Sequence, residues 1–138
     1  MDDFRRQLAE HLDAILGQGA EPMFLMVDLI GAEVLRYARD TESLPRFRET
    51  CMTSLSGAAG SAPVFAYGDF RIIGILGGYD RLKTFALVEK MRRTLPLLGQ
   101  SYDCVIAPEF DTIEYDAAAG IAGVINQLTA PRRQIEAA

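Results

Sequence analysis

Two aspartates in this sequence follow apolar runs, at places where a carboxylate could do chemistry. Asp28 follows the run Phe24–Val27, and Gly31 comes three positions later. Asp69 follows Gly68 in the middle of a second apolar segment. Because burying an unpaired carboxylate is costly, we expect Asp28 at the exit of a strand, where water, a metal or a backbone amide can reach it.

The chemistry that two such carboxylates could support is the binding of a divalent cation. Two carboxylates held close together repel each other unless they share a cation or a proton. Asp28 and Asp69 at one sheet edge would form a Mg²⁺ or Mn²⁺ site, with waters and phosphate oxygens as the other ligands. No cofactor is expected unless this pair is functional. Each residue also has a role without chemistry, because Gly-Asp is a favourable hairpin turn and Asp28 could cap a following helix.

The apolar periodicity predicts the elements that position these residues. Helices are expected over 3–17, within 31–60, over 81–95 behind an Asp80 cap, and from an Asp116 cap to Leu128. Strands are expected over about 23–29, in a hairpin over 63–67 and 70–76, and over Tyr102–Ile106, with a further short strand at Thr112–Tyr115. Residues 33–38 are ambiguous, since their side chains fit either a helix or an alternating strand.

This order of elements predicts an α+β fold with a ferredoxin-like βαββαβ core, an extra N-terminal helix and a C-terminal helix. In such a core the second hairpin strand lies antiparallel between the other two. The exit of the first strand and the hairpin turn then lie at the same sheet edge, where Asp28 and Asp69 would face each other. We expect one domain over 1–138, with 130–138 as a frayed tail.

The composition restricts the class of protein. The net charge of -5 argues against nucleic-acid binding, and no apolar run approaches the length of a bilayer span. Since the first residues lack the order of a signal peptide, we expect a cytoplasmic protein without membrane insertion. Cys51 and Cys104 do not have the spacing of a redox or zinc motif and are predicted as buried free thiols. His11, the one histidine, is predicted at the surface of the first helix.

The two acidic motifs resemble those of the nucleotide cyclase superfamily. Asp28-Leu29-Ile30-Gly31 matches the Asp-Ile/Leu-x-Gly motif that follows the first strand of class III adenylyl and guanylyl cyclases, and Tyr67-Gly68-Asp69 matches their hydrophobic-Gly-Asp turn. The layout is more similar to the GGDEF (diguanylate cyclase) branch, in which a helix precedes the first strand. The resemblance implies that Asp28 and Asp69 hold two metal ions, one of which activates the ribose 3′-hydroxyl.

The sequence also departs from the catalytic pattern of these enzymes. Phe70 stands where the GGDEF motif has its glutamate, Tyr67 replaces its first glycine and Ile30 replaces a frequent second acid. Phe65 takes the place of the class III lysine that reads the purine, and Asn126 is the one candidate for the residues that steady the transition state. No catalytic or cofactor-binding residue is assigned. The resemblance implies a degenerate signalling domain without catalysis, which acts as a regulatory, dimerising or nucleotide-sensing module.

Such a module would work as a homodimer, with a signalling-protein partner or with a nucleotide ligand. Two alternatives stand beside it. In the first, the domain is an active metal-dependent nucleotide cyclase that uses Asp28 and Asp69. In the second, residues 33–38 form a strand, and the chain up to Leu95 resembles the Roadblock/LC7 scaffolds, which are dimeric partners of GTPases and motors. The conformation of 33–38 discriminates between the Roadblock/LC7 layout and the cyclase layout.

Overall fold

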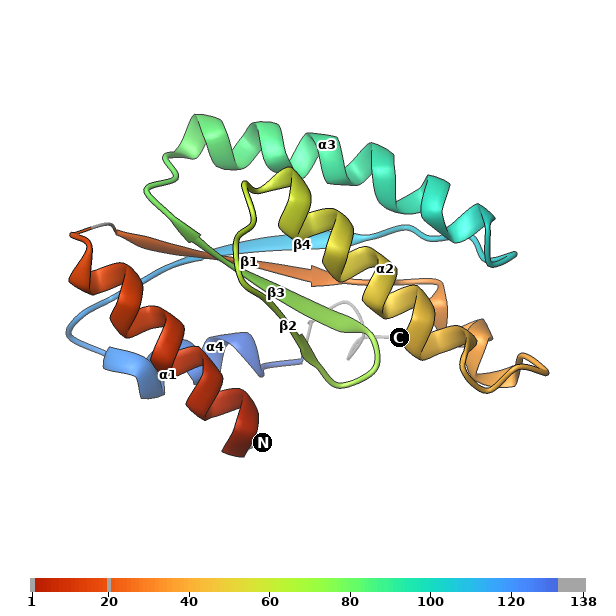
Figure 1. Cartoon of the computed structure of the whole chain (residues 1–138), viewed down its shortest axis with the longest axis horizontal. Coiled ribbons are helices and arrows are strands. Elements are labelled where there is room, and N and C mark those ends of the chain that lie inside the picture. Colours follow the sequence, from red (N-terminus) through yellow and green to blue (C-terminus); the bar gives the residue numbers. More distant parts are fainter. Residues whose placement is uncertain (1, 20, 132–138) are drawn as a thin grey trace.

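The computed structural model of the chain describes residues 2–19 and 21–131, and it contains a four-stranded antiparallel sheet between two layers of helices (Figure 1). The elements, in chain order, are α1 (Asp2–Gly17), β1 (Pro22–Asp28), the 3₁₀ helix η1 (Ala32–Tyr37), α2 (Ser43–Ala58), β2 (Val64–Tyr67), β3 (Arg71–Gly77), α3 (Arg81–Gln100), β4 (Glu109–Glu114) and α4 (Gly120–Leu128). The strands lie in the order β2-β3-β1-β4. The predicted α+β fold is confirmed, with β3 antiparallel between β2 and β1.

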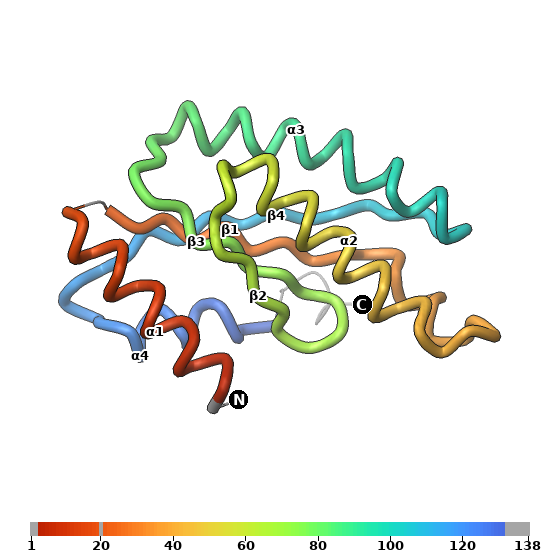
Figure 2. Tube along the Cα trace, in the orientation of Figure 1, coloured from red at the N-terminus to blue at the C-terminus, as the bar shows by residue number. Residues whose placement is uncertain are grey.

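The central strand β1 is buried along its whole length and organises the core. Because successive side chains of a strand point to opposite faces, its residues feed two separate apolar clusters. Leu25 and Val27 belong to the cluster with α2 and α3, whereas Phe24 and Met26 belong to the cluster with α1 and α4. The helices accordingly cover the sheet in pairs, α2 with α3 on one face and α1 with α4 on the other (Figure 2).

The last strand lies later in the chain than predicted. The segment Tyr102–Ile106 is irregular, and β4 begins at Glu109, so the further strand expected at Thr112–Tyr115 is the one that pairs with β1. The alternating apolar residues Cys104 and Ile106 are buried against the helices α2 and α3 instead of pairing in the sheet. The alternation of apolar residues in this segment therefore predicted correctly that one side is buried, but it did not predict that the segment lies outside the sheet.

Helix α3 continues five residues beyond its predicted end at 95, with Pro96 inside it. Leu95 and Gly99 are buried, and a Cβ on Gly99 would lie 2.6 Å from the Ile106 side chain, so close packing favours the last turn. The Asp80 cap is confirmed, because its carboxylate accepts a 2.7 Å hydrogen bond from the Lys83 amide. No described helix is long and apolar enough to cross a bilayer.

Residues 33–38 are not a strand. The 3₁₀ helix η1 occupies Ala32–Tyr37 and buries Ala32 and Leu35, so the Roadblock/LC7 layout, which needs a strand here, is wrong. The chain is turned into this helix at Gly31, whose φ of 105° is strained for residues with a side chain.

The structure also bears on three smaller predictions, for the Asp116 cap, for His11 and for the tail. Helix α4 begins at Gly120 without a side-chain cap, and the Asp116 carboxylate instead accepts a 2.9 Å bond from the Ala118 amide in the preceding turn. His11 is partly buried and packs against Phe65, with ring centroids 5.1 Å apart and the rings tilted by 55°. The frayed tail predicted over 130–138 lies outside the described residues from 132 onward.

Candidate functional site

The end of β1 lies beside the turn of the β2–β3 hairpin. Asp28 is the register partner of Arg71, and the Leu29 amide donates a 2.7 Å hydrogen bond to the Phe70 carbonyl oxygen. The turn residue Asp69 stands two positions before Arg71. Both aspartates therefore lie at the same end of the sheet, as the topology predicted.

The carboxylate of Asp28 is buried and bound by an arginine. Asp28 is 3% exposed and Arg71 is 7% exposed. Arg71 Nε donates to Asp28 Oδ1 at 2.6 Å and Nη2 donates to Oδ2 at 3.1 Å, a bidentate pairing of the kind that makes a strong charge-assisted contact. Arg71 Nη1 also donates to the carbonyl oxygens of Leu128, at 2.8 Å, and Ala130, at 2.6 Å. One guanidinium thus joins β1, β3 and the C-terminal end of α4.

The carboxylate of Asp69 is half exposed and is bound by two other arginines. Arg36 Nη2 of η1 donates to Oδ2 at 3.0 Å, and Arg48 Nη1 of α2 donates to Oδ1 at 3.3 Å. The guanidinium of Arg36 also lies over the Phe70 ring, 4.6 Å from its centroid. These partners come from the elements on the α2 side of the sheet, whereas Arg71 and Asp28 lie with the α4 side. The two carboxylates lie at the same end of the sheet but on different faces, so the prediction that they face each other is wrong.

This arrangement does not fit a divalent metal centre. All four carboxylate oxygens of Asp28 and Asp69 accept hydrogen bonds from guanidinium groups, so a cation would have to displace three arginines. Among the residues that the structure describes, no three histidine, cysteine or acidic side chains lie together in a group that could hold a metal. The metal role predicted for the two aspartates stays a prediction, and no chemical step is derived from it.

The glycine of the Asp-x-x-Gly motif has a packing role. A Cβ built on Gly31 would lie 1.9 Å from the carbonyl oxygen of Val105, so no side chain fits at this position. The adjacent Ile30 carbonyl accepts a 2.9 Å bond from the Ala107 amide. Close backbone approach and a positive φ together account for this glycine. The motif therefore holds the segment before β4 against the end of β1.

The other residues singled out in the sequence are dispersed. Tyr67 packs against Phe4, with ring centroids 5.5 Å apart, and Phe65 packs with His11 on the α1 side of the sheet. Asn126 is exposed on α4. Sequence reasoning missed Arg71, the residue that holds the site together. The available signal was the apolar run that follows it, because Arg71 begins a strand whose next five residues are buried on both faces of the sheet.

Comparison with known proteins shows the fold alone. No protein family model matches the sequence, and no curated protein matches it. Among solved structures, the chain is similar to the GGDEF domain of DgcB from Caulobacter crescentus, which was crystallised in complex with c-di-GMP. The match has 12% sequence identity and a TM-score of 0.67, and it covers 91% of this chain and 77% of that one. The chain therefore has a GGDEF-like cyclase fold, as the motifs at Asp28 and Asp69 predicted.

Proposed function

We propose that this GGDEF-like domain acts without nucleotide-cyclase chemistry, as a regulatory module that binds a nucleotide or a protein. The observation that carries the proposal is the buried bidentate ion pair between Asp28 and Arg71. Metal-assisted attack of a ribose hydroxyl on a phosphate needs carboxylates that can bind the cation. Here both oxygens of the carboxylate at the end of β1 are bound by Arg71, and Phe70 stands where the GGDEF motif, by resemblance, has a glutamate.

The turn of the β2–β3 hairpin, with Arg36 and Arg48 beside Asp69, favours an anionic ligand over a cation. Arg36 and Arg48 bring two guanidinium groups to one half-exposed carboxylate, so they carry more positive charge than Asp69 alone neutralises. Arginine is well suited to binding phosphate oxygens in a bidentate manner. A nucleotide phosphate would take the place of the Asp69 carboxylate between these arginines. The structure of DgcB with c-di-GMP makes cyclic dinucleotides the first ligands to test.

The direct experiment measures pyrophosphate release from GTP and ATP in the presence of Mn²⁺, with Asp28→Asn and Asp69→Asn beside the unaltered chain. The proposal predicts no release from any of the three proteins. Release that is lost in both variants would overturn the proposal and support an active metal-dependent cyclase.

Nucleotide sensing is tested separately by calorimetric titration with GTP, ATP and cyclic di-GMP. Binding that is weakened in Arg48→Ala but kept in Arg46→Ala, an arginine that pairs with Asp40 instead, would support a phosphate site at the turn. If none of the three nucleotides binds, the regulatory role falls to protein contacts.

A further inference from the structure

The two edges of the sheet differ in their protection against strand pairing. The outer strand β4 carries the acidic residues Glu109, Asp111 and Glu114, and charged side chains discourage the addition of another strand. The opposite edge is β2, whose sequence Val-Phe-Ala-Tyr has no charged residue. The edge at β2 is therefore open to pairing in a way that the edge at β4 is not.

The register shows which backbone groups β2 presents outward. The Ile75 amide donates to the Pro63 carbonyl oxygen at 3.0 Å, and hydrogen-bonded pairs alternate along an antiparallel ladder. Phe65 and Tyr67 therefore direct their amides and carbonyls toward β3. The amides and carbonyls of Val64 and Ala66 point away from the sheet, and they have no hydrogen-bond partner within the part of the chain that the structure describes.

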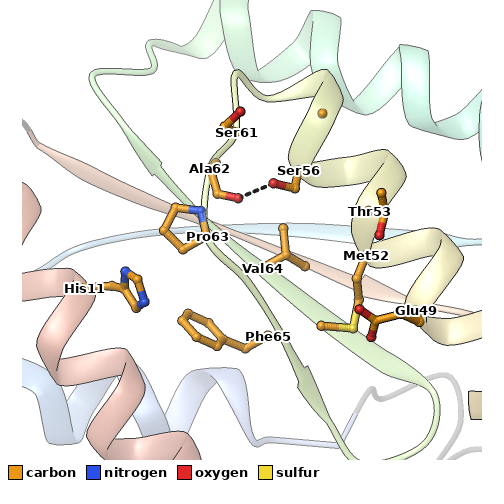
Figure 3. A pocket seen from close by; sticks show the side chains of 11 residues that line it. His11, Glu49, Met52, Thr53, Ser56, Ser61, Ala62, Pro63, Val64 and Phe65 are labelled. Carbon is orange, nitrogen blue, oxygen red and sulfur yellow. Dashed lines mark hydrogen bonds between the residues drawn. The ribbon is translucent and has the colours of Figure 1, made fainter.

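The outward carbonyls that flank these residues are already satisfied by the chain itself. Ser56 Oγ donates to the Ala62 carbonyl oxygen at 2.8 Å (Figure 3), and Arg48 Nη1 lies 3.5 Å from that of Gly68. Within β2, the outward backbone groups that have no partner in the described part of the chain are the two amides and two carbonyls of Val64 and Ala66. Unpaired backbone groups of this kind are best satisfied by another strand.

Open space lies along this edge, between β2, α1 and α2. A cleft of about 590 Å³ is lined by residues of all three elements. Phe65 and His11 lie on its α1 side, and Val64 points toward Met52 on its α2 side (Figure 3). Of the lining residues, Glu49 is the one carboxylate, so a strand added here meets mainly apolar and neutral groups.

We propose that a second copy of this chain pairs with β2 through its own β2, giving a continuous antiparallel sheet across a two-fold axis. Val64 of one copy lies opposite Ala66 of the other, and Phe65 lies on the axis opposite itself. This register satisfies all four outward groups of each copy, because Val64 and Ala66 each exchange an amide and a carbonyl with the opposite residue. The inference rests on the proposed binding role and names its partner.

A second copy fits better than an unrelated strand because the edge is complementary to itself. The two-fold axis places the bulkier Val64 against the small Ala66, so the α2 side of the new strand pair is not overfilled. On the α1 side, the two Phe65 rings form a non-hydrogen-bonded cross-strand pair, the closest kind, and aromatic pairs there are favourable. Each ring is already oriented by His11.

The test is sedimentation analysis of the full chain from micromolar to millimolar concentration. Ala66→Pro removes the outward amide while leaving the β2–β3 hydrogen bonds, and proline is tolerated on an edge strand when its amide would face solvent. Loss of two of the four intermolecular bonds raises the dimer dissociation constant about thirtyfold. The matched control is Thr112→Pro, because the ladder with β1 directs the Thr112 amide outward from β4 in the same way. This variant keeps the dimer.

A second variant keeps the test decisive if Ala66→Pro fails to fold. Phe65→Cys places one cysteine of each copy on the axis, at the short Cα separation that suits a disulfide, so oxidised glutathione links it into a covalent dimer. Thr112→Cys forms no covalent dimer under the same treatment, because its cysteine lies on β4 at the opposite edge of the sheet. A wild-type chain that is monomeric at millimolar concentration, or a dimer that is unaffected by Ala66→Pro while Phe65→Cys does not cross-link, overturns the proposal. The pyrophosphate assay reports on the proposed lack of catalysis independently, because it can be run on the monomeric variant.

Discussion

Arg71 holds the carboxylate of Asp28 in a buried bidentate ion pair, with donor–acceptor distances of 2.6 and 3.1 Å. Its remaining Nη1 is bound to the carbonyl oxygens of Leu128 and Ala130 at the end of α4. A buried charge pair of this kind is tolerated only when its other donors and acceptors are satisfied, and losing one partner costs about 3–5 kcal/mol. The aspartate that resembles a metal ligand is thus bound in a buried ion pair.

Arg71→Lys is expected to lower the free energy of unfolding by about 2–4 kcal/mol, although the charge is kept. An ammonium group cannot bridge both carboxylate oxygens and also cap two carbonyls in this planar geometry. Urea denaturation measures the loss. The control is Arg46→Lys, which alters an exposed arginine paired with Asp40 at 2.9 Å and should change stability by no more than about 0.5 kcal/mol. Equal effects at both positions would contradict the structural role of Arg71.

The same guanidinium should govern the stability of α4. In Arg71→Met, the amides of Gly120–Leu128 are expected to exchange with deuterium faster than in the unaltered chain, because the last carbonyls of the helix lose their donor and the buried Asp28 loses its partner. The amides of α3 serve as the internal reference, since this helix packs on the other face of the sheet. A uniform increase in exchange over both helices would show global destabilisation without a specific link to α4.

Gly31→Ala should destabilise the fold by about 3 kcal/mol or more, because the new Cβ meets the Val105 carbonyl oxygen at a residue with positive φ. Gly57→Ala is the matched control: it lies near the end of α2, a Cβ there meets nothing within 4 Å, and it should be neutral or stabilise by up to about 1 kcal/mol. Thermal or urea unfolding gives both values. If Gly31→Ala were tolerated as well as Gly57→Ala, the close approach of the two segments would be disproved.

The buried thiol of Cys51 should make the fold sensitive to alkaline pH. Burial, with a smaller contribution from the charge of Cys104, raises the pKa of Cys51 from its ordinary value of 9.0 to about 12. The folded state therefore keeps a proton that the unfolded chain releases, and the stabilisation is complete below pH 9 and is lost as the pH rises toward 12.

Urea unfolding of the unaltered chain and of Cys51→Ala, each at pH 8 and pH 10, checks this sign. The unaltered chain should lose more stability between the two pH values than the variant does, since the other titrating groups are common to both. Rapid alkylation of Cys51 in the folded protein at pH 8 would contradict the raised pKa, because the thiolate is the reactive form.

Much of the fold follows from local sequence patterns. The run that ends at Asp28 predicted β1, and the Gly68-Asp69 turn predicted the hairpin. The right-handed crossover expected from β1 to β2 placed β3 between these two strands. Two features did not follow. Helix α3 passes through Pro96 because Gly99 packs tightly against Ile106, and β4 begins at Glu109 because the preceding apolar residues pack on helices. Both outcomes depend on tertiary contacts that periodicity does not encode.

The sequence predicted where in the fold Asp28 and Asp69 lie, but it did not predict which side chains bind them. The shared edge of Asp28 and Asp69 follows from strand topology. The arginine partners do not, because Arg71 is 43 residues from Asp28, and its carbonyl partners lie 57 and 59 residues further along the chain. Arg71 begins the apolar strand β3, which is buried on both faces, and a buried arginine needs a carboxylate. That argument identifies Asp28 as an ion-pair residue as readily as a metal ligand.

The central claim, that Asp28 is an ion-pair residue without a metal, is tested most directly by the unfolding free energy of the unaltered chain and of Asp28→Asn, each with and without millimolar Mn²⁺. We predict that Asp28→Asn loses about 3 kcal/mol and that Mn²⁺ changes neither protein, because the carboxylate oxygens are bound by Arg71. A Mn²⁺-dependent stabilisation of the unaltered chain that disappears in Asp28→Asn would contradict the account and assign the residue to a metal site.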